Sequence, residues 1–393
     1  MWSDGIKQPR GEGDEVQLRD ALDHPRLDEL DGAAGIYQSP GWLRASAKMS
    51  PGPSRFASVP EGLAALYLVP SAAAGRYGLE TFLDEESIAS LGYRQEQPLA
   101  LFLGRAGYCS DLSRLPGSRE GIDARLLRAL GEEARRLGAG AGALSYLPPS
   151  SARRLVKAGV VDAAELVLQE GAVAVDLEAL ESYPAGLAAS RRGIVRRDER
   201  RYRRAGLRTE RRKLSQCLEF AAPLLAETVQ HHGGGISPQV LERVMAEQAR
   251  QLDDHSLVVA SRNEAGEVVA YSLSYRWGST LYVRLVGLRY SATEGSGAYF
   301  QVAYTETIRW ALEQQLETVE LGIGTLVPKL LRGGRLEPRY GVFRGPEGQR
   351  LPAEAVGQAS RRTWRRLEKE VKRVGALETL WSEEPTLAEV LGE

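Results

Sequence analysis

The chain has 393 residues, of which 43% are hydrophobic and 26% are charged, and its formal net charge at pH 7 is −1. This is the composition of an ordinary globular protein with room for two domains. No run approaches the ~18 apolar residues that span a bilayer, and the polar, acidic N-terminus is not typical of a secretory signal.

The cysteine and histidine content indicates the compartment and argues against a metal site. The two cysteines, Cys109 and Cys217, fit a reducing cytoplasm better than a disulfide framework. The four histidines and two cysteines show no zinc-ligand spacing. We therefore expect a cytoplasmic protein with no metal.

The first half of the chain follows a polar lead with alternating short strands and helices. Residues 1–34 are expected to form a loose acidic lead. Pro60-Glu61-Gly62 separates two apolar runs and predicts a hairpin. The expected strands are 56–59, 63–69, 101–103, 144–147 and 173–177, and helices are expected over 121–137 and from 150.

The second half repeats a similar order of helices, an antiparallel meander, a helix and a strand. Helices are expected over 183–205, 218–230, 238–251 and 299–314, and strands over 256–262, 268–277, 281–288 and 318–322. A basic amphipathic helix over 353–375 forms the tail. This order predicts an α+β protein of two halves joined near Asp176, and it argues against a doubly wound nucleotide-binding fold.

A dense basic segment lies between Arg191 and Lys213. It carries a net charge of +9, so the rest of the chain sums to −10. Such a field attracts phosphate groups or polyanions, although a solvated helix face would have the same composition. The candidate phosphate-binding or tRNA-binding residues are Arg192, Arg196, Arg197, Arg200, Arg201 and Arg203.

A glycine hinge follows the last predicted strand of the second half. Gly322 and Gly324 permit close backbone approach, and Lys329 and Arg332 are spaced to share a helix face. Exposed N–H groups with two cations make an anion cradle one interpretation. The alternative is a strand-end turn with solvated charges.

Several segments, in this order, resemble a known family. They are Trp42-Leu43 after Ser39-Pro40, Val175-Asp176-Leu177 before Tyr183 and the arginine-rich helix, Glu264-Ala265-Gly266, Ala298-Tyr299, and Gly322-x-Gly324 before Lys329-x-x-Arg332. The chain resembles GNAT-type acyltransferases of the FemAB-like group, which contain two GNAT-like domains in tandem. The resemblance covers roughly residues 35 to 350.

The resemblance implies a domain division and an activity. Each GNAT-like domain would be a mixed, mostly antiparallel sheet flanked by helices, over residues 35–176 and 177–350, with a helical tail over 351–393. Similar proteins form amides by moving an activated acyl group onto an amine. Some use acyl-coenzyme A and others use aminoacyl-tRNA, in cell-wall peptide synthesis or small antibiotic pathways. The donor would be a co-substrate rather than a tightly bound cofactor.

The GNAT pattern also suggests candidate site residues. A splayed strand near Val286, Gly287 and Leu288 would supply an N–H to the oxyanion. The catalytic candidates are Glu294 as a base, Tyr304 (with Tyr299) as a leaving-group acid, and Glu320 as a charge partner of the amine. An exposed loop acid and a core aromatic are the alternatives for Glu294 and Tyr304. The donor-binding candidates are Gly287, Gly295, Gly297, Gly324, Lys329 and Arg332.

The turn before the helix at Ala298 bears on the choice of donor. Acetyl-coenzyme A enzymes of this kind usually show Gln/Arg-x-x-Gly-x-Gly/Ala, whereas here Gly295-x-Gly297 survives and Glu294 stands where it would repel a phosphate. We therefore expect an aminoacyl-tRNA donor, a tRNA partner, and a small amine or peptide intermediate as acceptor in a cleft between the domains. An acyl-coenzyme A acetyltransferase and a non-catalytic RNA-binding protein remain the alternatives.

Overall fold

The computed structural model describes residues 15–33, 35–105, 107–180 and 182–375, and these form two compact units. The first unit takes the described residues up to Gly171 together with Glu337–Lys369, and the second takes Ala172–Leu336 with the described residues from Glu370 on. This differs from the predicted division, which placed 337–350 in the second domain. The reason is that β13 (Arg335–Arg344) pairs antiparallel with β6 (Ala141–Leu147) of the first unit.

The first unit is built on a mixed sheet with strand order β1-β2-β3-β4-β6-β13, and β5 pairs with β3. Its further strands are β1 (Gln17–Arg19), β2 (Ser54–Val59), β3 (Gly62–Val69), β4 (Leu99–Phe102) and β5 (Ser113–Arg114). Its helices are α1 (Leu27–Ala33), α2 (Pro40–Lys48), α3 (Glu85–Ser90), α4 (Ile122–Arg136), α5 (Pro149–Lys157) and most of α13 (Ala353–Lys372). The predicted hairpin is confirmed, because β2 and β3 pair antiparallel from Val59 and Gly62 outward.

The described part of the predicted loose lead is ordered structure. β1 pairs antiparallel with β2, and the buried His24 imidazole lies 2.7 Å from the Val59 carbonyl oxygen through its Nε2. Leu30 of α1 is fully buried. The expectation of a loose lead was therefore wrong for these residues, because β2 offers an edge for pairing. Residues 1–14 and 34 of that lead and 376–393 of the predicted tail lie outside the described residues.

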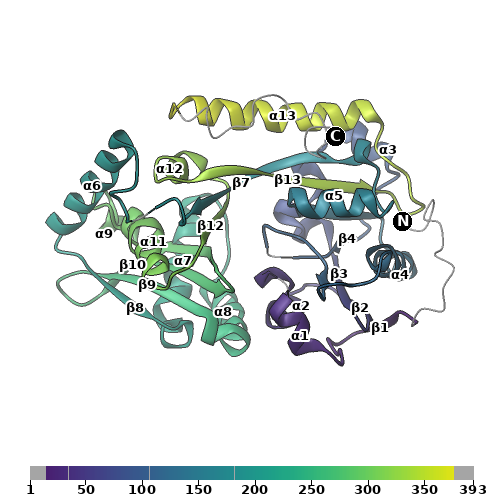
Figure 1. The fold of residues 1–393 in the computed structure, drawn as a ribbon, viewed down its shortest axis with the longest axis horizontal. Helices are drawn as coiled ribbons and strands as arrows, with labels where there is room; N and C mark the ends of the chain where they lie inside the picture. The colour runs from purple at the N-terminus through teal and green to yellow at the C-terminus, as the bar shows by residue number, and fades with distance from the viewer. Residues whose placement is uncertain (1–14, 34, 106, 181, 376–393) are drawn as a thin grey trace. The chain divides into compact units, whose positions relative to one another are not determined.

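The second unit contains a sheet of order β7-β12-β11-β10-β9-β8. Its strands β7, β8, β9, β10 and β12 are labelled in Figure 1. Its strands are β7 (Val167–Asp176, entering the unit at Ala172), β8 (Arg208–Arg212), β9 (Ser256–Arg262), β10 (Val268–Trp277), β11 (Thr280–Leu288) and β12 (Thr318–Ile323). Its helices are α6 (Ala189–Arg204), α7 (Leu218–His231), α8 (Pro238–Leu252), α9 (Tyr290–Thr293), α10 (Ala298–Phe300), α11 (Glu306–Glu313) and α12 (Leu326–Leu330). A π-helical turn, Gln301–Thr305, joins α10 to α11. Among the described strands of this sheet, β11 and β12 pair in parallel and the other neighbours pair antiparallel.

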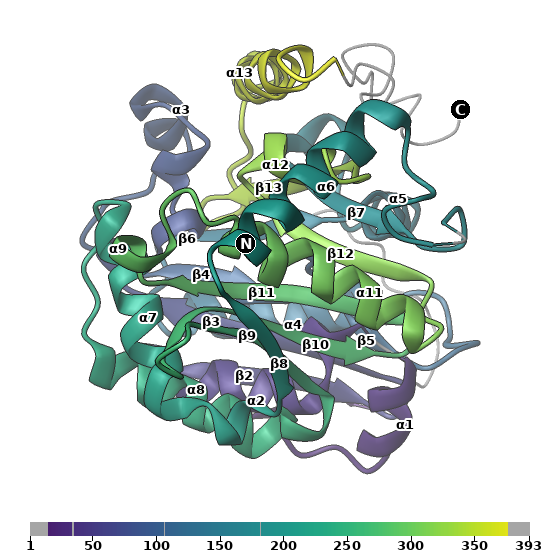
Figure 2. The same ribbon diagram turned by 90° about the vertical axis from the view of Figure 1, so that its left-hand side faces the viewer.

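Helices cover both faces of this sheet (Figure 2). Successive side chains of a strand point to opposite faces. The Tyr271 hydroxyl of β10 donates to the Ala221 carbonyl of α7 at 2.9 Å, whereas the next hydroxyl, of Ser272, donates to the Val302 carbonyl of the π-helical turn at 2.6 Å. The two helical layers are therefore fixed to the sheet by neighbouring residues of one strand.

Among the described residues, no helix combines the length and the apolar character that a membrane crossing requires. The same part of the chain holds no group of three or more His, Cys, Asp or Glu side chains arranged to bind a metal ion.

Candidate functional site

Strands β11 and β12 diverge in the middle of the second unit. They pair through only three residue pairs, from Thr280–Thr318 to Tyr282–Glu320, although β11 continues to Leu288. Beyond Tyr282, β11 keeps β10 as its neighbour on one side only. The outer backbone groups of β11 therefore lack a strand partner over this stretch.

The hydrogen bonds at the end of β11 show which N–H faces the divergence. Leu288 N–H donates to Thr228 Oγ1 of α7 at 2.8 Å, and Arg289 N–H donates to the Val269 carbonyl of β10 at 2.8 Å. Because N–H groups alternate along a strand, Val286 N–H points away from β10, as Leu288 N–H does. Of the three predicted oxyanion positions, Val286 is the one that the divergence leaves for a ligand.

Gly287 has a packing role at this position. A Cβ at Gly287 would lie 2.2 Å from Cε1 of Tyr271 and 3.0 Å from the Leu224 carbonyl carbon. The absence of a side chain therefore lets β11 lie against the buried Tyr271 ring and α7. These contacts are enough to explain why a glycine stands at position 287. The predicted role of Gly287 was to bind the acyl donor, whereas the contacts indicate a role in packing.

The turn between α9 and α10 carries two glycines with different surroundings. Gly295 and Gly297 have φ angles of 68° and 79°, which favour glycine. A Cβ at Gly295 would meet nothing within 4 Å, whereas one at Gly297 would lie 2.7 Å from the Asp198 carbonyl oxygen and 3.6 Å from Arg201 Cβ. The turn is thus open at Gly295, and helix α6 passes directly against Gly297.

The other side of this turn carries carboxylates. Glu294 is exposed and ends α9, and Glu227 of α7 accepts the Tyr290 N–H at 2.8 Å. The His231 ring stacks on the Tyr290 ring with centroids 3.6 Å apart. A side chain of α7 therefore accepts a backbone N–H at the start of the turn. At the end of the turn, the arginines of α6 lie close to Gly297.

Helix α6 presents an almost entirely basic surface to solvent. Its buried residues are Val195, Asp198 and Tyr202, at helical spacing. The Tyr202 hydroxyl lies 2.8 Å from Ser261 Oγ and 3.0 Å from Thr209 Oγ1, so this ring is not available to stack on a base. The exposed arginines of α6 that form no ion pair with a described residue are Arg196, Arg197, Arg200, Arg201, Arg203 and Arg204.

Arg192, another predicted phosphate ligand, holds the loop before α6. Its guanidinium donates to the Ala185 carbonyl at 2.8 Å and to the Leu187 carbonyl at 3.3 Å. Glu199 of the same helix pairs with Arg309 of α11. The five predicted arginines from Arg196 onward thus differ from Arg192, which is engaged with the backbone.

Lys329 and Arg332 lie in the interior instead of forming an exposed cradle. Lys329 Nζ donates to the carbonyls of Gly322 and Ile323, each at 2.9 Å. Arg332 is 2% exposed, pairs with Asp198 and donates to the Pro328 carbonyl at 2.8 Å. These contacts correct the prediction of a phosphate cradle, because both cations are directed at the protein's own oxygens.

The two glycines of the hinge, Gly322 and Gly324, have different surroundings. Gly322 has a φ of 71° and its N–H donates to Glu320 Oε1 at 3.2 Å. Gly324 has a φ of 69°, and a Cβ there would meet nothing within 4 Å. Glu320, a predicted charge partner of the amine, is buried at 9% exposure, and its carboxylate is engaged by the hinge. Gly324 is open to a ligand, and Glu320 is not at the surface.

Tyr299 and Tyr304, the predicted acids, hydrogen-bond to each other with their hydroxyl oxygens 2.8 Å apart. Tyr304 is buried at 2% exposure, and its ring lies 5.2 Å from the Arg332 guanidinium carbon. Burial raises the pKa of Tyr304 well above the ordinary value, and burial also raises the pKa of Tyr299. Both phenols are therefore neutral at pH 7, and Tyr299 is the more exposed of the two.

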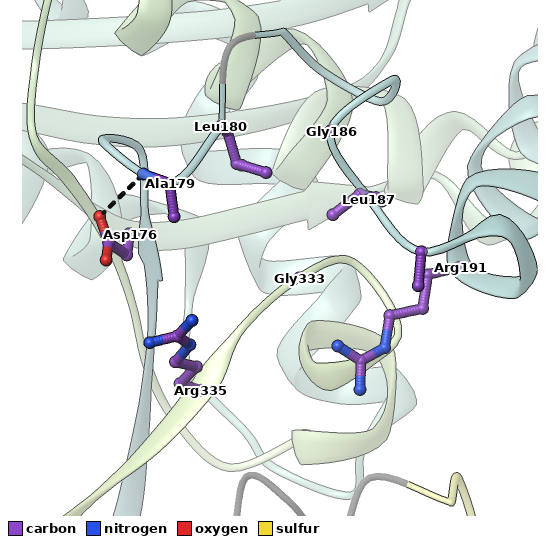
Figure 3. A pocket seen from close by; sticks show the side chains of 9 residues that line it. Asp176, Ala179, Leu180, Gly186, Leu187, Arg191, Gly333 and Arg335 are labelled. Carbon is purple, nitrogen blue, oxygen red and sulfur yellow. Dashed lines mark hydrogen bonds between the residues drawn. The ribbon is translucent and has the colours of Figure 1, made fainter.

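A pocket of about 360 Å³ lies in the second unit beside the start of α6 (Figure 3). Its charged lining side chains are Asp176 at the end of β7, Arg191 of α6 and Arg335 at the start of β13, and Leu180 and Leu187 are among its apolar ones. No pattern in the sequence predicts this pocket. Its charged residues are 15 and 144 positions apart along the chain, a separation at which sequence patterns give no signal.

The comparison with known families decides the class of the second unit. Residues 189–327 match the family described as the acetyltransferase (GNAT) domain. This segment starts at the first residue of α6 and ends within α12, so it contains the divergent strands, the glycine turn and the arginines. The chain carries a GNAT acyltransferase domain. The prediction of an acyltransferase is thereby confirmed, while no curated protein matches the chain by sequence.

Several solved structures align over most of the chain. A conserved protein of unknown function from Bacteroides thetaiotaomicron aligns with a TM-score of 0.53 and 13% identity, over 84% of this chain and 100% of that one. FemX aligns with a TM-score of 0.50 and 11% identity, over 83% and 96%. A tandem GNAT protein from the clavulanic acid biosynthesis pathway aligns with a TM-score of 0.46 and 12% identity, over 84% and 99%.

At these identities the similarity concerns the fold. The α+β fold of two tandem GNAT-like domains, and the resemblance to the FemAB-like group, are confirmed at that level.

Proposed function

We propose that this GNAT acyltransferase takes an aminoacyl group from aminoacyl-tRNA and transfers it to the amine of a small metabolite or peptide intermediate. The observation that carries the proposal is the row of exposed arginines on α6, beside the Gly297 turn, that pair with no described carboxylate. The helix has 16 residues and is therefore ~24 Å long. Cations spread over that length suit the repeating phosphates of a polynucleotide better than the compact diphosphate of a coenzyme.

The contacts around the turn weigh against acyl-coenzyme A. In GNAT enzymes that use it, backbone N–H groups between this strand and helix hold the pyrophosphate. Here the N–H groups of Leu288 and Tyr290 already donate to Thr228 and Glu227. The Glu227 and Glu294 carboxylates would also repel a diphosphate placed between them. The open Gly295 is the feature that would still admit a coenzyme.

The transfer requires an amine, an ester carbonyl and a donor for the oxyanion. The acceptor nitrogen attacks the aminoacyl ester carbon, so a C–N bond forms and the C–O bond to the ribose breaks. Val286 N–H is the group we assign to the oxyanion, and one such donor contributes ~3 kcal/mol. The proton lost by the amine balances the one gained by the ribose oxygen, either directly or through water.

Neutral tyrosine is suited to supply a proton to the leaving oxygen. Tyr299 is the better candidate of the tyrosine pair because it is more exposed than Tyr304. Glu294, exposed at the end of α9, is our candidate for the base. The Glu320 carboxylate is buried and accepts the Gly322 N–H. It could pair with the acceptor amine only after that hydrogen bond breaks.

The donor can be identified by supplying both classes to the purified protein. One reaction contains tRNA charged with radiolabelled amino acids, the other contains radiolabelled acetyl-coenzyme A, and both receive a small-molecule extract as the source of amines. We expect label to enter a small product only from tRNA, and ribonuclease added beforehand to abolish it. Labelling from acetyl-coenzyme A that survives ribonuclease would replace the proposal with a coenzyme-dependent activity. RNA binding without transfer would favour a role in RNA recognition.

A further inference from the structure

The pocket at the start of α6 combines cationic, anionic and apolar side chains from separate elements. Arg335 and Asp176 lie on one side of the Gly333 segment, and Arg191 extends from α6 on its other side (Figure 3). Leu180 and Leu187 line it as well. At about 360 Å³, the pocket lies at the small end of the ~300–1,000 Å³ range of ligand sites.

One carboxylate oxygen in this pocket accepts no hydrogen bond from the part of the chain that the structure describes. Asp176 Oδ1 accepts the N–H of Glu178 at 3.1 Å and of Ala179 at 3.4 Å, which fixes the carboxylate at the end of β7. No described residue donates to Asp176 Oδ2. Among the described residues, none forms an ion pair with Arg335 either. A negative and a positive group therefore remain available in one small pocket.

The pocket wall is shaped by two glycines. A Cβ at Gly333, which has a φ of 94°, would lie 2.7 Å from Leu187 Cδ2. One at Gly186 would lie 3.0 Å from Leu180 Cδ2. Both leucines are therefore packed against bare backbone, and this packing fixes the apolar part of the wall.

We propose that this pocket binds a free α-amino acid. Its carboxylate would lie against the guanidinium group of Arg335, and its ammonium group against Asp176 Oδ2. Arginine forms bidentate pairs with carboxylates, so the two ends of the zwitterion are distinguished by opposite charges on the protein. Leu180 and Leu187 would contact the side chain of the amino acid.

This site is separate from the position proposed for the donor. Arg191 lies near the start of α6, and Asp198, against Gly297, lies seven residues further on, which is ~10 Å along the helix axis. A ligand in the pocket therefore leaves the glycine turn free. The inference does not depend on the proposed function. If the aminoacyl transfer also holds, the pocket binds the acceptor, either as a free amino acid or through an amino-acid unit at one end of a larger acceptor.

Calorimetric titration of the full chain with each of the twenty L-amino acids, without tRNA, tests the proposal. We expect at least one to bind, and acetate and methylammonium alone to bind at least tenfold more weakly. Arg335→Gln and Asp176→Asn are each expected to weaken binding at least tenfold. Arg243→Gln, an exposed arginine on α8, is the matched control and should leave binding unchanged.

Two outcomes would overturn the inference. One is that no amino acid binds to the wild-type protein. The other is that inorganic phosphate or acetate binds as tightly as the best amino acid and Asp176→Asn has no effect, which would make the pocket a simple anion site. Because no donor is present, these outcomes are independent of whether the protein uses tRNA.

Discussion

Arg332 and Asp198 form an ion pair in which the two side chains are 3% and 4% exposed. The Arg332 guanidinium carbon also lies 3.8 Å from the centroid of the Phe300 ring. The pair therefore connects the segment after α12 with α6 and with α10. It fixes the arginine helix against the glycine turn that begins α10.

Removing either partner of this pair should destabilise the protein. Asp198→Ala or Arg332→Ala leaves one buried charge unpaired, and such changes cost about 3–5 kcal/mol. The double variant should lose less than the sum of the two, because neither charge then remains. Urea unfolding of the three variants measures this. Arg200→Ala, exposed and unpaired, is the control and should change the free energy of unfolding by less than about 0.5 kcal/mol. If each single variant changes the free energy of unfolding by less than about 0.5 kcal/mol, and the double variant by the sum of the two, the pair does not fix α6.

The two glycines of the turn should respond differently to alanine. Both have positive φ, so each substitution costs about 1–2 kcal/mol of backbone strain. Gly297→Ala adds a clash with the Asp198 carbonyl, whereas Gly295→Ala meets open space. We expect Gly297→Ala to lower thermal stability clearly more than Gly295→Ala. Equal effects in thermal denaturation would contradict the close packing of α6 on the turn.

Cys217 should resist alkylation in the folded protein. The thiol is fully buried, and burial raises its pKa to about 12. The thiolate is the reactive form, so at pH 8 almost none is present until the protein unfolds. Iodoacetamide labelling followed by peptide mass spectrometry should find Cys217 unmodified in buffer and modified in guanidinium chloride. Rapid labelling of the native protein at this position would contradict the packing described.

The sequence was sufficient to predict the basic helix, but not strand β8, which follows it. Val195, Asp198 and Tyr202 follow helical spacing, and the arginines between them are too numerous to be buried. The spacing could not show that Tyr202 bonds to strand β9, since a tyrosine has the same pattern in a core and on a binding surface. The order of elements likewise predicted the meander β9-β10-β11.

The roles of Lys329 and Arg332 could not be read from their spacing. Their partners are backbone carbonyls and Asp198, which is 134 positions away from Arg332. Cations beside glycines give the same sequence pattern whether they face a ligand or the interior. The return of β13 to the first unit was missed for a similar reason, because its pairing with β6 joins residues far apart in the chain.

The arginines of α6 can be tested against a control of equal charge. The test variant changes Arg196, Arg197, Arg200 and Arg201 to Gln. The control makes the same change at four other exposed arginines, Arg243 of α8, Arg361 and Arg365 of α13, and Arg373 just after α13. Each phosphate contact contributes to the slope of log affinity against log salt, by about 0.7–0.9 per contact. The control should therefore keep a slope and affinity close to those of the wild type.

The most direct test of a polynucleotide donor on α6 is the equilibrium binding of tRNA across a salt series. It is measured for the wild type and both variants. We predict that the α6 variant binds at least tenfold more weakly at low salt and that its slope is smaller by two or more units. An α6 variant with the affinity and slope of the wild type would contradict the claim that this helix receives a polynucleotide donor.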